Sequence, residues 1–460
     1  MPSVRFITSV LLFAAPFVAA KAQEIPLEQI DQKIASTLAA YGAPSVSVAI
    51  VRNGTLAYAK AFGDANIAAR QAATTATRYA VGSISKQFTV AALLLAQERG
   101  KLSLDDKVGK YLPELTRSNE VSIRQLLSHT SGYQDYAPQD YMIEEWAKPT
   151  TPEAIMDHWA KKALDFDPGT RWQYSNTNYT IAGKILEKAT GQDLMAFLQA
   201  NILSPLGMQS AGDCDVRNPQ DATAYTRFAL GPPRVVAREG AGWYFAAGEL
   251  CMTPSDLAKW DIAFLQKRIL SAASYAQFTK ETKLADGKGT HYALGLSLGE
   301  TQGLPTISHG GEVSGFLASN TLFPTKDTGI IVLSNEDGVN MVPTVTREVA
   351  AALFAPGDAA SSARDAQVRH VLEELAHGKI DRSLFTQNAN EYFTETALRD
   401  IQTSLAPLGS LKVLSRQSEQ LRGGMTHLSY RARFEHDTVA LNIYLMPDGK
   451  FEQFMVEETF

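Results

Sequence analysis

The sequence contains a single S-x-x-K pattern, formed by Ser83 and Lys86, at the start of a long apolar stretch. Apolar residues then recur at helical spacing until Arg99 and Gly100, which predicts a buried helix. Residues three apart share a helix face, so the serine hydroxyl and the lysine amine can meet. Burial at a helix start pushes a lysine toward its neutral form, and a neutral amine can accept a serine proton. The pair is therefore a candidate nucleophile and base.

A second candidate group is Tyr174-Ser175-Asn176, which follows a Pro-Gly turn and precedes a predicted helix over residues 180–189. A tyrosine hydroxyl can pass a proton to a leaving group, and an asparagine amide can bond both Lys86 and a substrate amide. Taken alone, the same residues also fit a helix cap and a core tyrosine.

The third candidate group is His309-Gly310-Gly311-Glu312, in a region of strand-like segments. Two glycines after a histidine let the backbone pass close to a bound acyl group, and the amide that follows can point at a developing oxyanion. A lone histidine in a strand is usually structural. The histidine group therefore indicates a function only in combination with the other two groups.

Together and in this order, the three groups resemble those of the penicillin-recognising serine hydrolases. The branch concerned holds class C β-lactamases, D-alanyl-D-alanine carboxypeptidases, D-aminopeptidases and related esterases. The resemblance covers about residues 30–354, and three connecting segments are also typical of the branch: residues 126–132 (LLSHTSG), 205–208 (PLGM) and 246–250 (AAGEL). It implies an α+β, β-lactamase/transpeptidase-like fold, in which an antiparallel sheet has flanking helices and a helical region.

The resemblance also implies a role for each residue. Ser83 would be the acylated nucleophile, Lys86 its activating neighbour and Tyr174 the general acid/base. The residues implied to bind substrate are Asn176, His309, Gly310, Gly311 and Glu312. The backbone N–H groups of Ser83 and Glu312 would form the oxyanion hole, and water activated near Tyr174 would release the acyl group.

One departure from the pattern bears on the substrate. Where class C β-lactamases carry Lys-Thr, this sequence has His309-Gly310, and a largely neutral imidazole without a neighbouring hydroxyl weakens binding of a free carboxylate. We therefore expect a serine hydrolase of ester or amide and peptide bonds, acting on a small-molecule or peptide substrate. The same chemistry leaves open a D,D-peptidase or β-lactamase acting on cell-wall peptides or β-lactams. A non-hydrolytic penicillin-binding-type receptor is the alternative of another class.

The N-terminus predicts a signal peptide over residues 1–22. Arg5 precedes an apolar stretch over residues 6–20, and small residues stand at the cleavage positions near Ala22. We expect a periplasmic or secreted protein with no membrane span in the mature chain. The formal net charge is −6 without a basic block, which disfavours nucleic acid as a partner. The oligomeric state stays open.

The cysteines and histidines do not suggest a metal or cofactor. The two cysteines, Cys214 and Cys251, fit either a single disulfide or two buried thiols, because sequence separation does not say whether they meet. The eight histidines have no metal-ligand spacing. We expect no metal ion and no cofactor.

The domain organisation follows from composition and periodicity. A β-lactamase-like hydrolase domain is predicted over residues 23–355, a linker over 356–366 and a C-terminal α+β accessory domain over 367–460. Within the first domain, Asn53-Gly54 predicts a hairpin, and residues 292–298, 319–323 and 330–334 are strand-like. The accessory domain loosely resembles nuclear-transport-factor-like modules, and packing or substrate docking is its expected role. Seven aromatic residues are candidates for the pocket mouth: Tyr133, Tyr136, Tyr141, Trp146, Trp172, Trp243 and Tyr244.

Overall fold

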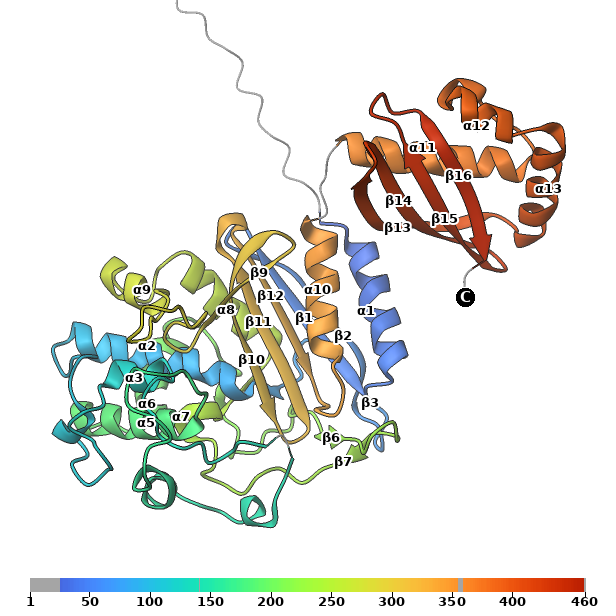
Figure 1. Cartoon of the computed structure of the whole chain (residues 1–460). Coiled ribbons are helices and arrows are strands. Elements are labelled where there is room, and N and C mark those ends of the chain that lie inside the picture. Colours follow the sequence, from blue (N-terminus) through green and yellow to red (C-terminus); the bar gives the residue numbers. More distant parts are fainter. Residues whose placement is uncertain (1–24, 140, 355–358, 459–460) are drawn as a thin grey trace, which may run out of the picture. The chain divides into compact units, whose positions relative to one another are not determined.

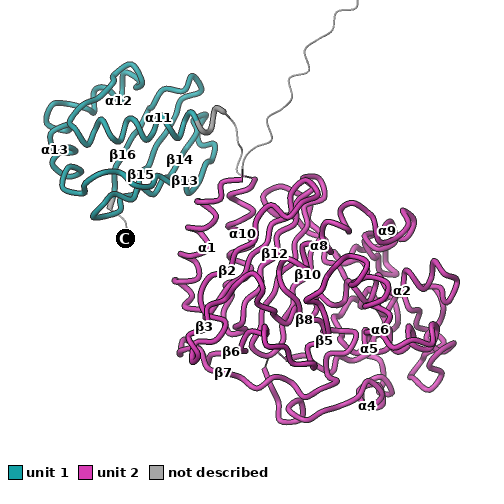
Figure 2. Tube along the Cα trace, turned by 180° about the vertical axis from the view of Figure 1, so that it is seen from behind, with its two compact units in different colours: residues 1–23, 356–460 teal, residues 24–355 magenta. Residues whose placement is uncertain are grey.

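The computed structural model describes residues 25–139, 141–354 and 359–458. The predicted signal peptide over residues 1–22 lies outside these ranges. The chain divides into two compact units between residues 355 and 356 (Figure 2). The N-terminal unit, drawn in magenta, is called the first unit below, and the C-terminal unit, drawn in teal, is called the second. None of the helices in the described ranges combines the length and the apolar character that crossing a bilayer requires.

The first unit is built on a seven-stranded antiparallel sheet (Figure 1). Its strand order is β3-β2-β1-β12-β11-β10-β9, so β1 near the N-terminus pairs directly with β12 near the end of the unit. The strands are β1 (Ser45–Arg52), β2 (Thr55–Asn66), β3 (Gln71–Ala72), β9 (Ser297–Thr301), β10 (Leu304–Val313), β11 (Phe316–Phe323) and β12 (Thr328–Ser334).

Helices cover both faces of this sheet (Figure 1). Two helices, α1 (Leu27–Tyr41) and α10 (Met341–Phe354), lie side by side on one face, where they form a core with apolar side chains of β1 and β12. On the other face, α8 (Pro254–Leu265) and a helical region pack around the central helix α2 (Ser85–Glu98). Helix α2 is buried at every position from Ser85 to Ala96, because helices and sheet surround it.

The helical region interrupts the sheet between β3 and β9. Its two longest helices in the described ranges are α5 (Asn176–Thr190), with 15 residues, and α2, with 14. The short helices of this unit are α3 (Ile123–Leu127), α4 (Pro152–Ile155), α6 (Leu194–Leu198), α7 (Phe245–Gly248) and α9 (Ala272–Phe278). The short strands are β4 (Tyr79–Ala80), β5 (Gly212–Asp213), β6 (Tyr225–Thr226), β7 (Arg234–Val235) and β8 (Leu250–Met252). The predicted α+β, β-lactamase/transpeptidase-like class is therefore confirmed.

Local predictions for this unit are mostly right. The hairpin at Asn53-Gly54 is present, and both turn residues have the positive φ angles that such a turn requires. The predicted strand over residues 292–298 is wrong in its first half, because Gly295 has a φ of 65° and the chain turns there; β9 begins only at Ser297.

The second unit is a four-stranded antiparallel sheet, β13-β14-β15-β16, with three helices. Its elements are α11 (Ala359–Ala376), α12 (Gln387–Tyr392), α13 (Glu395–Leu405), β13 (Leu411–Arg422), β14 (Met425–Phe434), β15 (Thr438–Leu445) and β16 (Phe451–Glu458). The sheet has a core of its own, in which Leu428, Tyr430, Ala432 and Phe434 alternate inward along β14. The resemblance to nuclear-transport-factor-like modules stays a prediction.

The predicted linker over residues 356–366 needs a correction. Helix α11 begins at Ala359, so residues 359–366 are helical. We interpreted the stretch as a flexible linker because it is rich in alanine and serine. However, alanine has the highest intrinsic helix propensity, and no proline or glycine separates residues 359–366 from the apolar residues of α11.

A buried acid in α8 makes the stability of the first unit depend on pH. Burial raises the pKa of Asp261 to about 8, and the hydrogen bond from Asn320 Nδ2 (2.6 Å) opposes this shift. A raised pKa in the folded state means that ionisation opposes folding, so stability falls as pH rises from about 4 toward 8. Asp261 Oδ2 and Asn320 Oδ1 also lack partners in the described structure.

We expect Asp261→Asn to remove this pH dependence. An amide has the shape of the neutral acid and can exchange two hydrogen bonds with Asn320 without ionising. Thermal unfolding at pH 5 and pH 8 measures the effect: the gain in Tm over the wild type should be larger at pH 8. An equal change in Tm at both pH values would contradict the assignment.

Candidate active site

Three side chains from two distant parts of the sequence meet at the boundary between the sheet and the helical region. Ser83 lies in a 3₁₀ turn (Gly82–Ile84) that leads into α2, and Lys86 lies in the first turn of that helix. Tyr174 precedes α5. The Ser83 Oγ atom is 2.8 Å from Lys86 Nζ and 2.8 Å from Tyr174 Oη. The S-x-x-K and Y-S-N groups of the sequence are thus one site.

Lys86 is completely buried and has three hydrogen-bond partners. Its Nζ atom lies 2.8 Å from Ser83 Oγ, from Asn176 Oδ1 and from the carbonyl oxygen of Ala247. Burial lowers the pKa of Lys86 to about 7, and the charge of Asp135 opposes this effect. A neutral amine has two hydrogens for the two carbonyl oxygens and one lone pair for the serine hydroxyl. Lys86 is therefore placed to accept the Ser83 proton.

Tyr174 is suited to donate a proton. Burial raises the pKa of its phenol, the hydrogen bond to Ser83 opposes this shift, and the charge of Asp135 adds to it. The phenol is therefore protonated at neutral pH, where a large part of Lys86 is neutral. Of the two groups, Lys86 is the better base in the resting enzyme, and Tyr174 is the better acid for a leaving group.

A buried histidine that the sequence analysis did not single out supports Tyr174. The ring of His129 lies 4.3 Å from the Tyr174 ring between centroids, and its Nδ1 accepts the backbone N–H of Ser175 at 3.2 Å. Burial, with the charge of Lys86, lowers the pKa of His129 well below its ordinary value. His129 is thus a neutral ring that fixes the position of the tyrosine. Its only sequence signal was the segment over residues 126–132.

Asp135 is the second residue that the sequence analysis missed. Its Oδ1 atom accepts the backbone N–H of Asn176 at 2.8 Å, at the start of α5, and Asn176 Nδ2 lies 3.4 Å from Oδ2. Asn176 therefore bridges Asp135 and Lys86. The pKa of Asp135 is raised above its ordinary value by burial, and the hydrogen bonds from Asn176 and Ala137 and the charge of Lys86 oppose this rise only in part. A single aspartate in a loop gives no recognisable pattern, so only the fold reveals it.

The third group lies on β10, beside Ser83. A Cβ atom on Gly311 would stand 1.9 Å from the Val81 carbonyl oxygen, and one on Gly82 would stand 2.8 Å from the backbone nitrogen of Glu312. Both positions require glycine, because the β10 backbone passes directly against the Ser83 turn. This close approach brings the Glu312 backbone next to the serine, whereas Gly310 has no such neighbour.

His309 is neutral and bonded within the protein. Burial lowers its pKa to about 4, and the charge of Lys86 adds to this effect. Its Nδ1 lies 2.5 Å from the Gly310 carbonyl oxygen, and its Nε2 lies 2.9 Å from Tyr292 Oη. A neutral ring satisfies both contacts by donating from Nδ1 and accepting at Nε2. His309 thus lines the cleft without offering a charge or a free N–H to a substrate carboxylate.

The site opens into a cleft of about 1240 Å³. Six of the seven aromatic candidates line it: Tyr136, Tyr141, Trp146, Trp172, Trp243 and Tyr244. The seventh, Tyr133, is core, and its hydroxyl bonds the Thr116 carbonyl oxygen at 2.8 Å. Within the described part of the chain, the charged residues that line the cleft are acidic: Asp135, Glu239, Glu312 and Asp337. Among the described residues, no group of three His, Cys, Asp or Glu side chains could hold a metal ion.

The pKa of Lys86 predicts how activity depends on pH. If the neutral amine accepts the Ser83 proton, kcat/KM should rise with pH through an apparent pKa near 7 and then level off. A neutral ester substrate is suitable, because its own charge does not change between pH 5 and 9. A profile that rises instead near pH 4, the pKa of His309, would mean that the base is another group.

The sheet with its helical region and the Ser–Lys–Tyr cluster at their boundary define a hydrolase with a nucleophilic serine. Comparison with known proteins agrees with this assignment. Residues 30–354 match the model of the Beta-lactamase family. The chain therefore belongs to this family of serine hydrolases.

Relatives within the family include amide hydrolases. A D-aminopeptidase of Brucella melitensis biotype 2 is 26% identical over 440 residues, which cover 89% of this chain and 82% of that protein. A D-aminopeptidase of Brucella canis is 28% identical over 310 residues, and the match spans 65% of this chain and 57% of the relative. Among solved structures, a D-stereospecific amidohydrolase from Streptomyces sp. has a TM-score of 0.61 at 26% identity, over 71% of this chain and 98% of that one.

Proposed function

We propose that this protein is an exported serine hydrolase that cleaves amide or peptide bonds, and simple esters, through an acyl-enzyme on Ser83. The observation that carries the proposal is the contact of Ser83 Oγ with both a lysine of lowered pKa and a protonated tyrosine. The names of the relatives, D-aminopeptidase and D-stereospecific amidohydrolase, support amide bonds as the target.

The geometry suggests the following steps. Ser83 Oγ attacks the carbonyl carbon while Lys86 takes its proton, and the backbone amides of Ser83 and Glu312 stabilise the oxyanion. The C–N bond then breaks as Tyr174 gives its proton to the leaving nitrogen. The proton on Lys86 then passes to the Tyr174 phenolate, which restores the neutral amine and the phenol. In the second half, water near Tyr174 attacks the ester. Lys86 accepts the water proton, rather than Tyr174 as the resemblance implied, because Lys86 is the better base, and this proton passes to Ser83 Oγ as the acid leaves.

The charge of the cleft suggests which substrates it accepts. Four carboxylates line it, and no lysine or arginine stands among the residues that line it in the described ranges. Such a field attracts a substrate that carries an ammonium group and repels one that carries a carboxylate. Of the four, Asp135 is bonded to Asn176 beside the reacting serine. We propose that it binds the free amine of an amino-acid amide or a short peptide.

The substitution Asp135→Asn tests this assignment. Asn keeps an oxygen for the backbone N–H of Asn176 but loses the charge. A charge-assisted hydrogen bond contributes about 1.5–3 kcal/mol, so kcat/KM for an amino-acid amide with a free amine should fall roughly 10- to 100-fold. The N-acetylated amide should lose less than about threefold.

Asp337→Asn is the matched control, since Asp337 lines the same cleft but bonds Gly315, in the turn between β10 and β11. It should leave the ratio of the two substrates unchanged. Equal losses on both substrates in Asp135→Asn would show that Asp135 only orders Asn176.

The two alternatives have distinct signatures. A D,D-peptidase or β-lactamase needs a group for the substrate carboxylate, and His309 offers neither a charge nor a free N–H. A non-hydrolytic receptor would be acylated at Ser83 without turnover. Steady-state hydrolysis of esters and free-amine amides, compared with nitrocefin and with a peptide ending in D-alanyl-D-alanine, separates the three. Turnover of either anionic substrate at the rate of the best amide would overturn the proposal.

Export is the second part of the proposal. Its support is the predicted signal peptide over residues 1–22 together with a disulfide between Cys214 and Cys251, which is typical of proteins that fold in an oxidising compartment. Expression of the full chain in a bacterial host should yield a product that begins after Ala22. A product in the cytoplasm that keeps its apolar N-terminus would count against export.

A further inference from the structure

One segment of the chain bonds the base of the active site in addition to Asn176. It comprises α7 and β8, residues 245–252, and is called the α7–β8 segment below. Its Ala247 carbonyl oxygen accepts a hydrogen bond from Lys86 at 2.8 Å. Its Ala246 carbonyl oxygen accepts one from Thr89 Oγ1, also at 2.8 Å, one helical turn further along α2. The position of the lysine amine therefore depends on where this segment sits.

The same segment also holds the chain on either side of Ser83. The Leu250 carbonyl oxygen accepts the backbone N–H of Val81 at 3.0 Å, and the Leu250 N–H donates to Ser85 Oγ at 3.1 Å. In addition, β8 pairs with β4, which leads into the serine turn. A displacement of the α7–β8 segment would therefore move the nucleophile and its base together.

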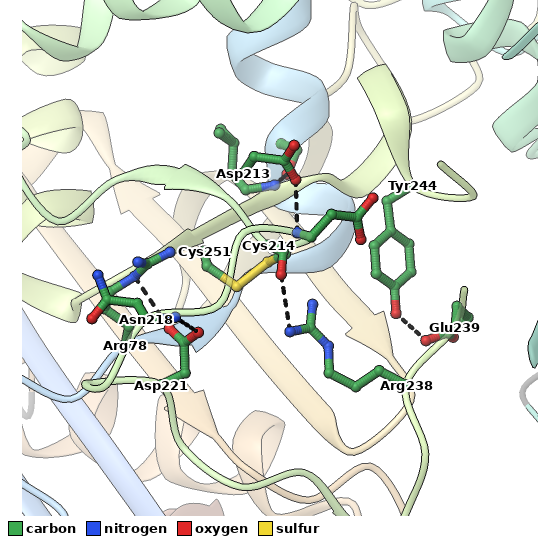
Figure 3. The surroundings of a disulfide bond; sticks show 12 residues. Arg78, Asp213, Cys214, Asn218, Asp221, Arg238, Glu239, Tyr244 and Cys251 are labelled. Atoms are coloured by element: carbon green, nitrogen blue, oxygen red, sulfur yellow. Dashed lines mark hydrogen bonds and ion pairs between the residues drawn. A yellow bond between two sulfur atoms is a disulfide. The ribbon is translucent and has the colours of Figure 1, made fainter. Parts of the chain in front are cut away.

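A disulfide joins this segment to the neighbouring loop (Figure 3). Cys251, in β8, is bonded to Cys214, which directly follows β5, and both are buried. The Cys214 N–H donates to the Glu249 carbonyl oxygen at 2.7 Å. Arg238 donates to the Cys214 carbonyl oxygen at 3.2 Å. The disulfide thus lies on the side of β8 away from β4, in a sheet ordered β4-β8-β5.

This small sheet is a weak support without its crosslink. Strands β4 and β5 have two residues each and β8 has three, so few ladder bonds hold them together. The two cysteines are 37 residues apart, and the chain between them contains long loops. A crosslink across such a loop restricts the positions that the α7–β8 segment can take.

We propose that the Cys214–Cys251 disulfide is a positioning element for Lys86: it keeps the α7–β8 segment against α2, so that the Ala247 carbonyl oxygen stays at the lysine amine and water stays out. This inference rests on the proposed function, because it assigns the disulfide an effect on the catalytic base. The loss of the crosslink should admit water to Lys86 and favour its charged form, which cannot accept the Ser83 proton.

The test compares the Cys214→Ser/Cys251→Ser variant with the wild-type protein on a neutral ester between pH 5 and 10. At pH 7, kcat should fall about fivefold, because a rise of one in a pKa that starts near 7 lowers the neutral fraction of the base from about one half to about one tenth. At pH 9 to 10, kcat should be within about threefold of the wild type, and KM should change less than about twofold throughout.

Val48→Ala is the matched control for lost stability. Val48 is buried on β1 in the core that contains α1 and α10, on the face of the sheet away from the site. It should lower Tm without moving the pH profile. If the double variant does not fold, Thr89→Val is measured instead. This substitution removes the hydrogen bond from Thr89 Oγ1 to the Ala246 carbonyl oxygen, which holds the same segment. The expected result is a two- to threefold loss in kcat at pH 7 that disappears at pH 9.

Each outcome decides one question. An upward shift of the apparent pKa in the disulfide variant or in Thr89→Val, and not in Val48→Ala, supports the positioning role. An unchanged profile in the disulfide variant, or in Thr89→Val where that variant stands in, overturns it and leaves the proposed function intact. If the wild-type protein does not hydrolyse the ester, or if Ser83→Ala hydrolyses it as fast, then the proposed function itself fails.

Discussion

Replacing Ser83 with alanine is expected to lower kcat for amides and esters by at least about 10³-fold. The alanine leaves the turn and α2 in place but removes the oxygen that touches both Lys86 and Tyr174. Without it, neither group has a nucleophile to activate, and the remaining rate would come from oriented water and the oxyanion site alone. Steady-state kinetics on the best ester and the best free-amine amide measure the loss.

Ser319→Ala provides the matched control for this experiment. Ser319 also lines the cleft, and its hydroxyl bonds Thr321 rather than the catalytic groups. The kcat of Ser319→Ala should stay within about twofold of the wild type, because a substitution away from the reacting atoms usually has a small effect. If Ser83→Ala kept more than a tenth of the wild-type rate, another nucleophile would have to be sought.

Replacing Lys86 with methionine is expected to have an effect of similar size, about 10³-fold in kcat. Methionine has a similar length and suits a buried position, but it cannot accept a proton. The distinctive result lies in the pH profile: the rise through an apparent pKa near 7 should disappear, because the group that titrates there is gone.

The methionine variant also leaves the Asn176 Oδ1 and Ala247 carbonyl oxygens without a donor. An unpaired buried acceptor costs about 1–3 kcal/mol, so the kinetics should be measured well below Tm. Circular dichroism at the assay temperature verifies that the variant is folded. A folded Lys86→Met enzyme whose rate still rises through pH 7 would assign the base to another residue.

How much of the site could be predicted depends on how each residue is specified. Ser83 and Lys86 are three apart in a 3₁₀ turn that continues directly into α2, so helical geometry alone predicts their contact. Tyr174 and His309 come from other elements, and nothing local in their segments says which partners they meet. For these residues the resemblance to a family supplied the arrangement, and Tyr174 lies where that arrangement requires.

The features that were missed share a physical reason. Asp135 and His129 act through burial and through contacts with the start of α5, and neither property is visible in a local pattern. Whether Cys214 and Cys251 are bonded could not be predicted for the same reason, because the pairing of β5 with β8 brings the two cysteines together. The start of α11 was mistaken for a linker because its composition, rich in alanine and serine, fits both a helix and a flexible segment.

Intact-protein mass spectrometry after reaction with a fluorophosphonate tests most directly whether Ser83 is the nucleophile. The expected result is one added phosphonyl group per chain, located on the peptide that contains Ser83, with labelling that becomes faster as pH rises through 7. The Ser83→Ala protein should gain no mass. Labelling of a different residue, or no labelling of a folded and correctly oxidised wild-type protein, would contradict the assignment of Ser83 as the acylated residue.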